Sequence, residues 1–226
     1  MMGIKKLIFW VAGGIASGKS TFCRSLSDYL QNNDIPCHWI EVDLVRRHIL
    51  YKSQSKKHYE ARTALMKSLN LKETHNNFLP ADFWQIIFSQ KKKMEIYKEI
   101  MNPEIIAALK QKMKSLEGII LLEWAMLIED GMLTLTDNNV MLFDIDANTQ
   151  LKRLENGWLS EEEVRNRIRF TAWWWFANRE KIIIKTQKEK GFWTCLSLKA
   201  NLTQTEINKA IHFIHSLYDY ENSWSV

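Results

Sequence analysis

The chain has 226 residues, of which 46% are hydrophobic and 25% are charged, and its formal net charge is +5. This composition can bury a core, which excludes a disordered chain, and the length fits one domain with an insert better than two independent domains. Cys23, Cys37 and Cys195 have no paired spacing, so the sequence indicates neither a zinc motif nor a disulfide framework.

The first expected elements are an apolar strand over 7–12 and an amphipathic helix over 21–30, joined by a glycine-rich loop. That loop reads Gly13-Gly14-Ile15-Ala16-Ser17-Gly18-Lys19-Ser20, which is the P-loop pattern in its strand-to-helix setting. Glycines at the bends let backbone N–H groups turn toward phosphate oxygens, and the helix N-terminus favours the same anion. A plain glycine-rich turn is the alternative, against which the Lys-Ser pair argues.

The loop predicts a binding site for ATP. We expect Lys19 to reach the β- and γ-phosphates and the Ser20 hydroxyl to bind Mg²⁺. The expected nucleotide-binding residues are Gly13, Gly14, Ile15, Ala16, Ser17, Gly18, Lys19, Ser20 and Thr21.

The second strand, expected over 38–42, is followed by Asp43. Ligands of parallel sheets bind at the carboxyl ends of the strands, where a carboxylate can orient an attacking hydroxyl. We therefore predict that Asp43 is a catalytic base or a magnesium partner, with Arg46 and Arg47 on the following helix. A helix N-cap is the alternative role for Asp43, and the two roles can coexist.

Residues 45–117 contain no good strand, and the spacing of their apolar residues indicates several helices. We interpret this span as a helical insert that binds the acceptor of the phosphoryl group. The run Lys91-Lys92-Lys93 is by default a solvated helix face, although it can also guide a polyphosphate.

Strands are next expected over 118–123 and 140–145. Glu123 ends the first of these and can hold a Mg²⁺-bound water, or it is a strand-end surface acid. Arg153 follows the second, and we predict that it neutralises charge in the transition state, with a solvated helix face as the alternative.

A charged segment over 155–192 is interpreted as a lid, and it contains four consecutive aromatic residues, 173–176. These four residues cannot all face one side of a helix. Three roles therefore stay open for them: packing within the protein, stacking on an adenine and burial in an interface. A fifth strand is expected over 193–198 and a last helix through Tyr218, with Asn201 before that helix contributing to nucleotide binding.

The alternation of strands and helices predicts an α/β P-loop fold of three layers with a five-stranded parallel sheet, forming one kinase domain over 1–226. Basic residues are interleaved with acidic ones, so we expect a small-molecule acceptor and no nucleic acid. No signal peptide and no run of about 18 apolar residues is recognised, so we expect no membrane partner and a cytoplasmic location. The oligomeric state is left open.

Several motifs together resemble the dephospho-coenzyme A kinase family over much of the chain. The loop over 13–21 resembles the P-loop of that family, and Glu41-Val42-Asp43 with Arg47 resembles its Asp-Ala-Asp motif with a trailing Arg. Further resemblances, in the family's order and spacing, lie at 83–105, at Ala125-Met126-Leu127-Ile128-Glu129 and at 146–153.

The resemblance implies an ATP- and Mg²⁺-dependent kinase of coenzyme A biosynthesis, which phosphorylates the ribose 3′-hydroxyl of dephospho-coenzyme A. On this basis Asp43, Arg47 and Glu129 are expected to bind the acceptor. Lys19, Asp43 and Arg153 are the expected catalytic residues, and Ser20 and Glu123 the expected metal partners.

The chain departs from the family pattern at Glu41, Leu79-Pro80, Asn102 and Thr171, where acceptor recognition and lid chemistry are expected. The ATP-binding pattern is intact. Two other hypotheses therefore stay open: a P-loop kinase for another acceptor such as a nucleoside, because 12–19 also resembles the uridine-kinase loop, and a nucleotide-binding regulator with a rebuilt lid.

Overall fold

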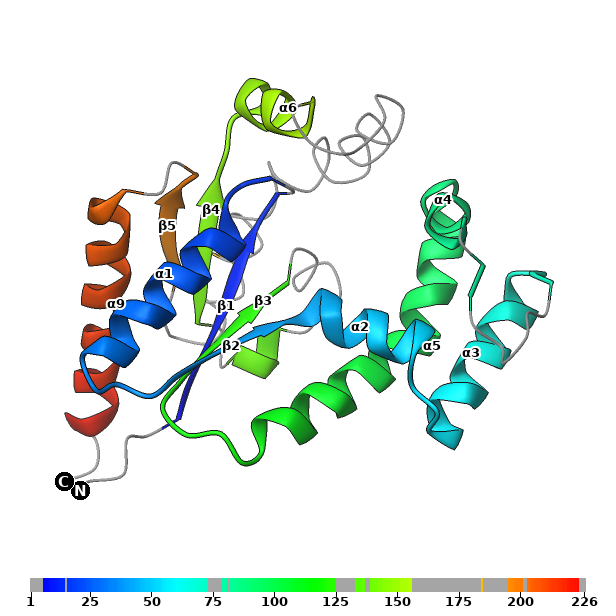
Figure 1. The fold of residues 1–226 in the computed structure, drawn as a ribbon, viewed down its shortest axis with the longest axis horizontal. Helices are drawn as coiled ribbons and strands as arrows, with labels where there is room; N and C mark the ends of the chain where they lie inside the picture. Colours follow the sequence, from blue (N-terminus) through cyan, green and yellow to red (C-terminus); the bar gives the residue numbers. More distant parts are fainter. Residues whose placement is uncertain are drawn as a thin grey trace. The chain divides into compact units, whose positions relative to one another are not determined.

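The computed structural model describes residues 6–14, 16–72, 79–80, 82–124, 133–136, 139–155, 184, 195–200 and 203–223. The chain divides into two compact units, one of residues 1–40 and 116–226 and one of residues 41–115. Figure 1 labels the helices and strands of each unit.

The first unit contains a five-stranded sheet in the order β2-β3-β1-β4-β5. Its strands are β1 (Leu7–Gly13), β2 (Cys37–Glu41), β3 (Ile119–Glu123), β4 (Val140–Asp144) and β5 (Cys195–Lys199). β1 pairs in parallel with both β3 and β4, and β4 pairs in parallel with β5. The central position of β1 buries both of its faces, as its apolar sequence requires. The predicted fold class is confirmed.

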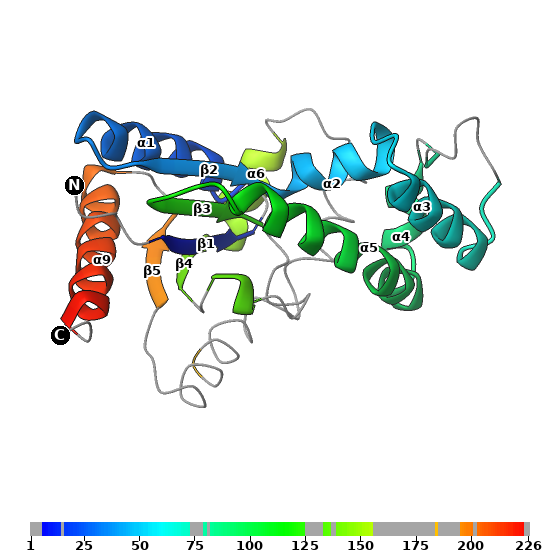
Figure 2. The same cartoon turned by 90° about the horizontal axis from the view of Figure 1, so that it is seen from below.

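Helices α1 (Lys19–Asn32) and α9 (Gln204–Ser223) share one hydrophobic core with the sheet, and α1 runs along it (Figure 2). Phe9 of β1 meets Phe213 of α9 edge-on, with ring centroids 5.8 Å apart, and Phe22 of α1 meets Phe143 of β4 in the same way at 4.8 Å. Phe143 is the register partner of Gly13, the last residue of β1, so its packing against Phe22 joins both ends of the loop between β1 and α1 to β4.

The other face of β1 is covered by the residue that follows β3 and by a short helix before β4. The Trp10 indole is completely buried and donates a hydrogen bond to the carbonyl oxygen of Trp124, just beyond β3. The short helix η2 (Leu133–Thr136) also packs on β1, and Asn139 donates to the Ile8 carbonyl oxygen at 3.2 Å. Helix α6 (Ala147–Glu155) follows β4.

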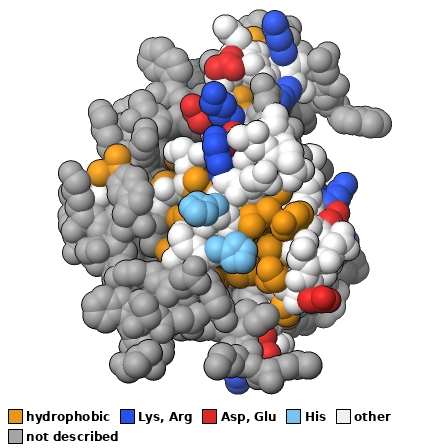
Figure 3. Space-filling view, turned by 90° about the vertical axis from the view of Figure 1, so that its left-hand side faces the viewer, with side chains coloured by type: hydrophobic (Ala, Val, Ile, Leu, Met, Phe, Trp, Pro, Cys, Tyr) orange, Lys and Arg blue, Asp and Glu red, His pale blue; other side chains and the backbone are white. Residues whose placement is uncertain are grey.

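On the side of α9, hydrophobic side chains gather beside histidines (Figure 3). His212 and His215 are exposed on α9, while Phe213 and Leu217 are half-buried against the core. None of the described helices combines the length and the apolar character needed to cross a membrane.

The second unit consists of helices α2 (Val42–Tyr51), α3 (Lys56–Ser68), α4 (Phe83–Phe88) and α5 (Lys91–Met113), with α5 packed against the other three. Arg62 is buried in this unit, and it donates to the carbonyl oxygens of Ile49 at 2.5 Å and Ser53 at 3.0 Å. It thereby closes the end of α2, whose last carbonyl groups have no partner within the helix. Helices α3, α4 and α5 fall in the span 45–117 that was predicted to be helical, whereas α2 begins before that span, at Val42. The acceptor-binding role of the span stays a prediction.

Candidate functional site

The loop between β1 and α1 is shaped by close contacts that only glycine permits. Gly18 caps α1 in the left-handed conformation, with φ +92°, which glycine adopts without steric cost. A Cβ atom on Gly13 would lie 2.7 Å from Phe143 Cβ and 2.8 Å from Ser17 Oγ, so a larger residue would push the loop away from β4. The Ser17 N–H donates to the Gly14 carbonyl oxygen at 3.2 Å and closes the turn.

The ammonium group of Lys19 lies inside this loop. Its Nζ donates to the Gly14 carbonyl oxygen at 2.8 Å and to Ser17 Oγ at 3.4 Å, and the residue is buried. Helix α1 begins at Lys19, so its first unpaired N–H groups and the positive end of its dipole lie beside the ammonium. The two together form an anion-binding site.

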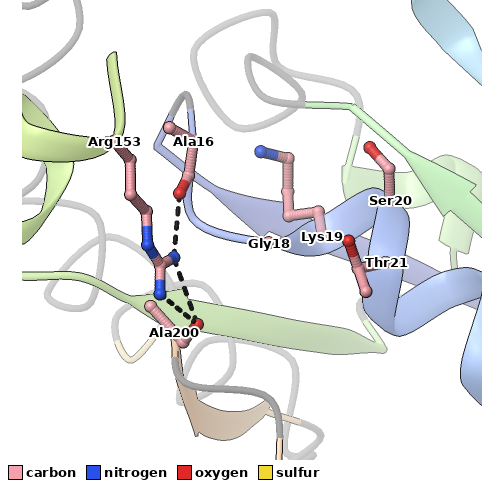
Figure 4. A pocket seen from close by; sticks show the side chains of 7 residues that line it. All are labelled: Ala16, Gly18, Lys19, Ser20, Thr21, Arg153 and Ala200. Atoms are coloured by element: carbon pink, nitrogen blue, oxygen red, sulfur yellow. Dashed lines mark hydrogen bonds between the residues drawn. The ribbon is translucent and has the colours of Figure 1, made fainter. Parts of the chain in front are cut away.

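A pocket of about 440 Å³ opens beside the loop (Figure 4). This volume is within the range of roughly 300–1,000 Å³ that is typical of small-molecule sites. Its lining consists of Ala16, Gly18, Lys19, Ser20, Thr21, Arg153 and Ala200. All of these except Ala200 were predicted from the sequence to belong to the site.

Glu123 is held between two donors at the carboxyl end of β3. Ser20 Oγ donates to its Oε1 at 2.6 Å, and the Trp39 indole donates to its Oε2 at 3.0 Å. The Arg24 guanidinium lies over the Trp39 ring, 5.9 Å from its centroid. The sequence predicted Ser20 and Glu123, and the structure brings them together. Trp39 was missed, because no sequence pattern shows that β2 and β3 are neighbours.

The Ser20–Glu123 pair fits the predicted magnesium ion. A hydroxyl and a carboxylate are the hard oxygen donors that Mg²⁺ prefers, and Mg²⁺ commonly takes one or two carboxylates together with water and phosphate oxygens. The pair also adjoins Lys19, so a cation there would meet the phosphates that the loop is built to bind.

Arg153 of α6 ties the loop to the segment after β5. Its Nη1 donates to the Ala16 carbonyl oxygen at 3.0 Å, and both terminal nitrogens donate to the Ala200 carbonyl oxygen at 3.2 Å (Figure 4). Ala16 has φ +59°, a left-handed conformation that costs a residue with a Cβ atom roughly 1–2 kcal/mol. The sequence predicted a role in charge neutralisation, whereas these contacts let Arg153 hold the strained loop in place.

Asp43 lies in the second unit, in the first turn of α2, where the helix dipole favours a carboxylate. The N-cap position is occupied by Glu41, so the alternative that Asp43 caps the helix is wrong. Arg46 Nη2 lies 2.9 Å from Asp43 Oδ1, and its guanidinium carbon lies 4.3 Å from the centroid of the Trp84 ring. Arg47 is exposed on the same helix.

Some predicted site residues, namely Ile15, Glu129 and Asn201, lie outside the described part of the chain. The family departure at Thr171, the aromatic run 173–176 and nearly all of the predicted lid also lie outside it. Their expected roles stay predictions.

Comparison with known proteins connects this geometry to one family. The family model for dephospho-CoA kinase matches residues 7–173. A dephospho-CoA kinase of Buchnera aphidicola is 26% identical over 220 residues, which cover 95% of this chain and 93% of the relative. A dephospho-CoA kinase of Carboxydothermus hydrogenoformans is 30% identical over 170 residues, which cover 72% of this chain and 76% of the relative.

Two solved structures share the fold. TT1252 from Thermus thermophilus has a TM-score of 0.63 at 18% identity, and the match covers 94% of this chain and 97% of that one. A gluconokinase from Sinorhizobium meliloti has a TM-score of 0.51 at 10% identity, with 97% and 98% covered. At these identities the likeness concerns the fold alone.

Proposed function

The chain belongs to the dephospho-CoA kinase family, and we propose that it transfers the γ-phosphoryl group of ATP to the ribose 3′-hydroxyl of dephospho-CoA. The observation that supports this most strongly is the grouping of Lys19, Ser20 and Glu123 around one glycine-shaped loop, inside the span matched by the family model. Phosphoryl transfer depends mainly on positioning and charge neutralisation, which this grouping supplies.

Lys19 is the proposed partner of the β- and γ-phosphates. Its Nζ already lies in the loop on the Gly14 carbonyl oxygen, so binding ATP requires an exchange of that neutral acceptor for phosphate oxygens. Phosphate oxygens carry negative charge and the Gly14 carbonyl oxygen does not, so attraction to the ammonium favours the exchange. Ile15 and Asn201 are proposed as further nucleotide contacts.

Ser20 and Glu123 are the residues that would hold Mg²⁺. When bound, the ion neutralises charge on the β- and γ-phosphate oxygens. The Trp39 indole, which donates to the second oxygen of Glu123, fixes the direction in which the carboxylate points.

Asp43 is the proposed general base. The ribose 3′-oxygen attacks the γ-phosphorus as Asp43 accepts the hydroxyl proton, and the bond from the γ-phosphorus to the bridging oxygen breaks to release ADP. Arg47, Glu129 and the helices of the second unit are proposed to bind the acceptor. We also propose a cytoplasmic location.

The test is ADP release measured with dephospho-CoA, with its 3′-deoxy analogue and with a panel of nucleosides. The proposal expects release with dephospho-CoA alone, and phosphate at the 3′ position of the product. A faster rate with a nucleoside would assign a different acceptor. Tight ATP binding without ADP release for any acceptor would favour a regulatory nucleotide-binding protein.

A further inference from the structure

Arg46 is fixed from two sides within the second unit. Its Nη2 is 2.9 Å from Asp43 Oδ1 on its own helix α2, and its guanidinium carbon is 4.3 Å from the centroid of Trp84 on α4. The Trp84 ring is itself held by Phe83 and Tyr97, whose ring centroids lie 5.0 Å and 5.4 Å away in edge-on arrangements. The position of Arg46 is therefore set by a packed aromatic group outside its own helix.

This arrangement differs from an ordinary ion pair on a helix surface. An exposed pair contributes little, because ordering two long side chains offsets most of the attraction. Here the planar guanidinium stacks on an indole, which orders it before any carboxylate is bound. The Arg46 side chain is 20% exposed and that of Asp43 is 55% exposed, so the cation is fixed while the carboxylate stays accessible.

We propose that Arg46, stacked on Trp84, is a positioning residue that fixes the Asp43 carboxylate in the orientation from which it accepts the acceptor proton. The inference rests on the proposed function, in which Asp43 is the base. A general base must come within about 2.6–3.2 Å of the oxygen that loses its proton. A displacement of about 1 Å can lower the rate roughly 10²-fold, so holding one carboxylate oxygen has a kinetic effect.

Variants on the two sides of the stack test this role. Arg46→Ala and Trp84→Leu are expected to lower kcat by about 10- to 100-fold while KM for ATP stays within a few-fold, because the loss concerns orientation and not nucleotide binding. Trp84→Phe keeps an aromatic face and is expected to retain most of kcat. Asn208→Ala, which removes an exposed 3.0 Å hydrogen bond with Gln204 on α9 of the first unit, is the control and leaves kcat unchanged.

Chemical rescue separates positioning from a merely structural role. Guanidinium chloride at low millimolar concentration is expected to restore part of the kcat of Arg46→Ala, because the ion can occupy the space between Asp43 and Trp84. The same ion is expected to leave the kcat of Asp43→Asn and the kcat of the wild type unchanged. Thermal melting shows whether each variant is folded. If Arg46→Ala is not folded, the kcat of Trp84→Leu compared with that of Trp84→Phe decides whether the stacked guanidinium has a positioning role.

The outcomes distinguish this inference from the function on which it rests. If Asp43→Asn loses activity while folded Arg46→Ala and Trp84→Leu keep the wild-type kcat, the positioning role is overturned and the base stands. A reduced kcat that guanidinium does not restore, matched by an equal reduction for Trp84→Phe, would also overturn it. If Asp43→Asn itself keeps the wild-type rate, the base assignment fails first.

Discussion

Ser20 donates a hydrogen bond of 2.6 Å to Glu123 Oε1 across 103 residues of sequence. The bond joins the start of α1 to the carboxyl end of β3, which lies beside β1 in the sheet. The two metal partners proposed for the kinase are therefore neighbours, and the indole of Trp39 holds the other oxygen of the same carboxylate.

Glu123→Gln is expected to raise the Mg²⁺ concentration needed for half-maximal rate and to lower kcat by about 10- to 1,000-fold, because a neutral amide is a weak partner for a hard cation. Trp39→Phe, which removes one charge-assisted bond, should have a smaller effect of the same kind. Rates measured over a Mg²⁺ titration check this, with the exposed Glu117→Gln as control. An unchanged titration for Glu123→Gln would remove it from the metal site.

Arg153→Ala is expected to raise KM for ATP about tenfold, because losing bonds from a charged donor costs about 1.5–3 kcal/mol and the strained Ala16 is released. Kinetics and calorimetric ATP binding measure the effect, with the exposed neighbour Lys152→Ala as control. If kcat fell instead while ATP affinity held, the guanidinium would act on transition-state charge, as the sequence predicted.

Asp43→Asn is expected to lower kcat by about 10²–10⁴-fold, the range for loss of a positioned general base. The amide keeps the shape of the side chain, so ATP affinity measured by calorimetry with Mg²⁺ should stay within a few-fold. If nucleotide binding were abolished, Asp43 would be a metal partner. A kcat near that of the wild type would leave it with a structural role only.

Cys37 is expected to make stability depend on pH in the alkaline range. Burial raises the pKa of its thiol from 9.0 to about 11, against a smaller lowering by a hydrogen bond with Ser27. The folded chain thus holds this proton more tightly than the unfolded chain. The contribution is fully present below about pH 9 and is lost as pH rises toward 11.

Urea unfolding at pH 8 and pH 10.5 measures this loss. Cys37→Ala should lose less unfolding free energy between the two pH values than the wild type, while the half-buried Cys195→Ala should behave like the wild type. Equal losses for Cys37→Ala and the wild type would show that the thiol is not the group responsible.

The parts of the site that lie close together in the sequence could be predicted, and those that depend on strand order could not. The residues from Gly13 to Ser20 form one continuous loop, so their spacing is visible in the sequence. The contact of Trp39 with Glu123 depends on β2 lying beside β3, which hydrophobic periodicity does not specify. Arg153 was predicted from its charge and from the family resemblance over 146–153, and its contacts with two backbone carbonyl groups follow from the packing of α6 near the loop.

For Asp43, the sequence did not predict at which residue the helix begins. Its place after an apolar strand was enough to suggest a role in catalysis, but the exact start of the helix was not predictable. Glu41 takes the extended N-cap conformation and α2 begins at Val42, so Asp43 is already inside the first turn. Its pairing with Arg46 follows from that position, since residues three apart on a helix are neighbours.

Phosphoryl transfer to dephospho-CoA by the P-loop is measured by mass spectrometry of the coenzyme A that the wild type and Lys19→Ala form from ATP and dephospho-CoA at saturating ATP. The wild type is expected to form 3′-phosphorylated product, and folded Lys19→Ala is expected to be slower by about 10²–10³-fold or more, because it lacks the loop cation that stabilises the transferring group. Equal rates for the two proteins, or no coenzyme A formed by a wild type that binds ATP, would contradict this mechanism.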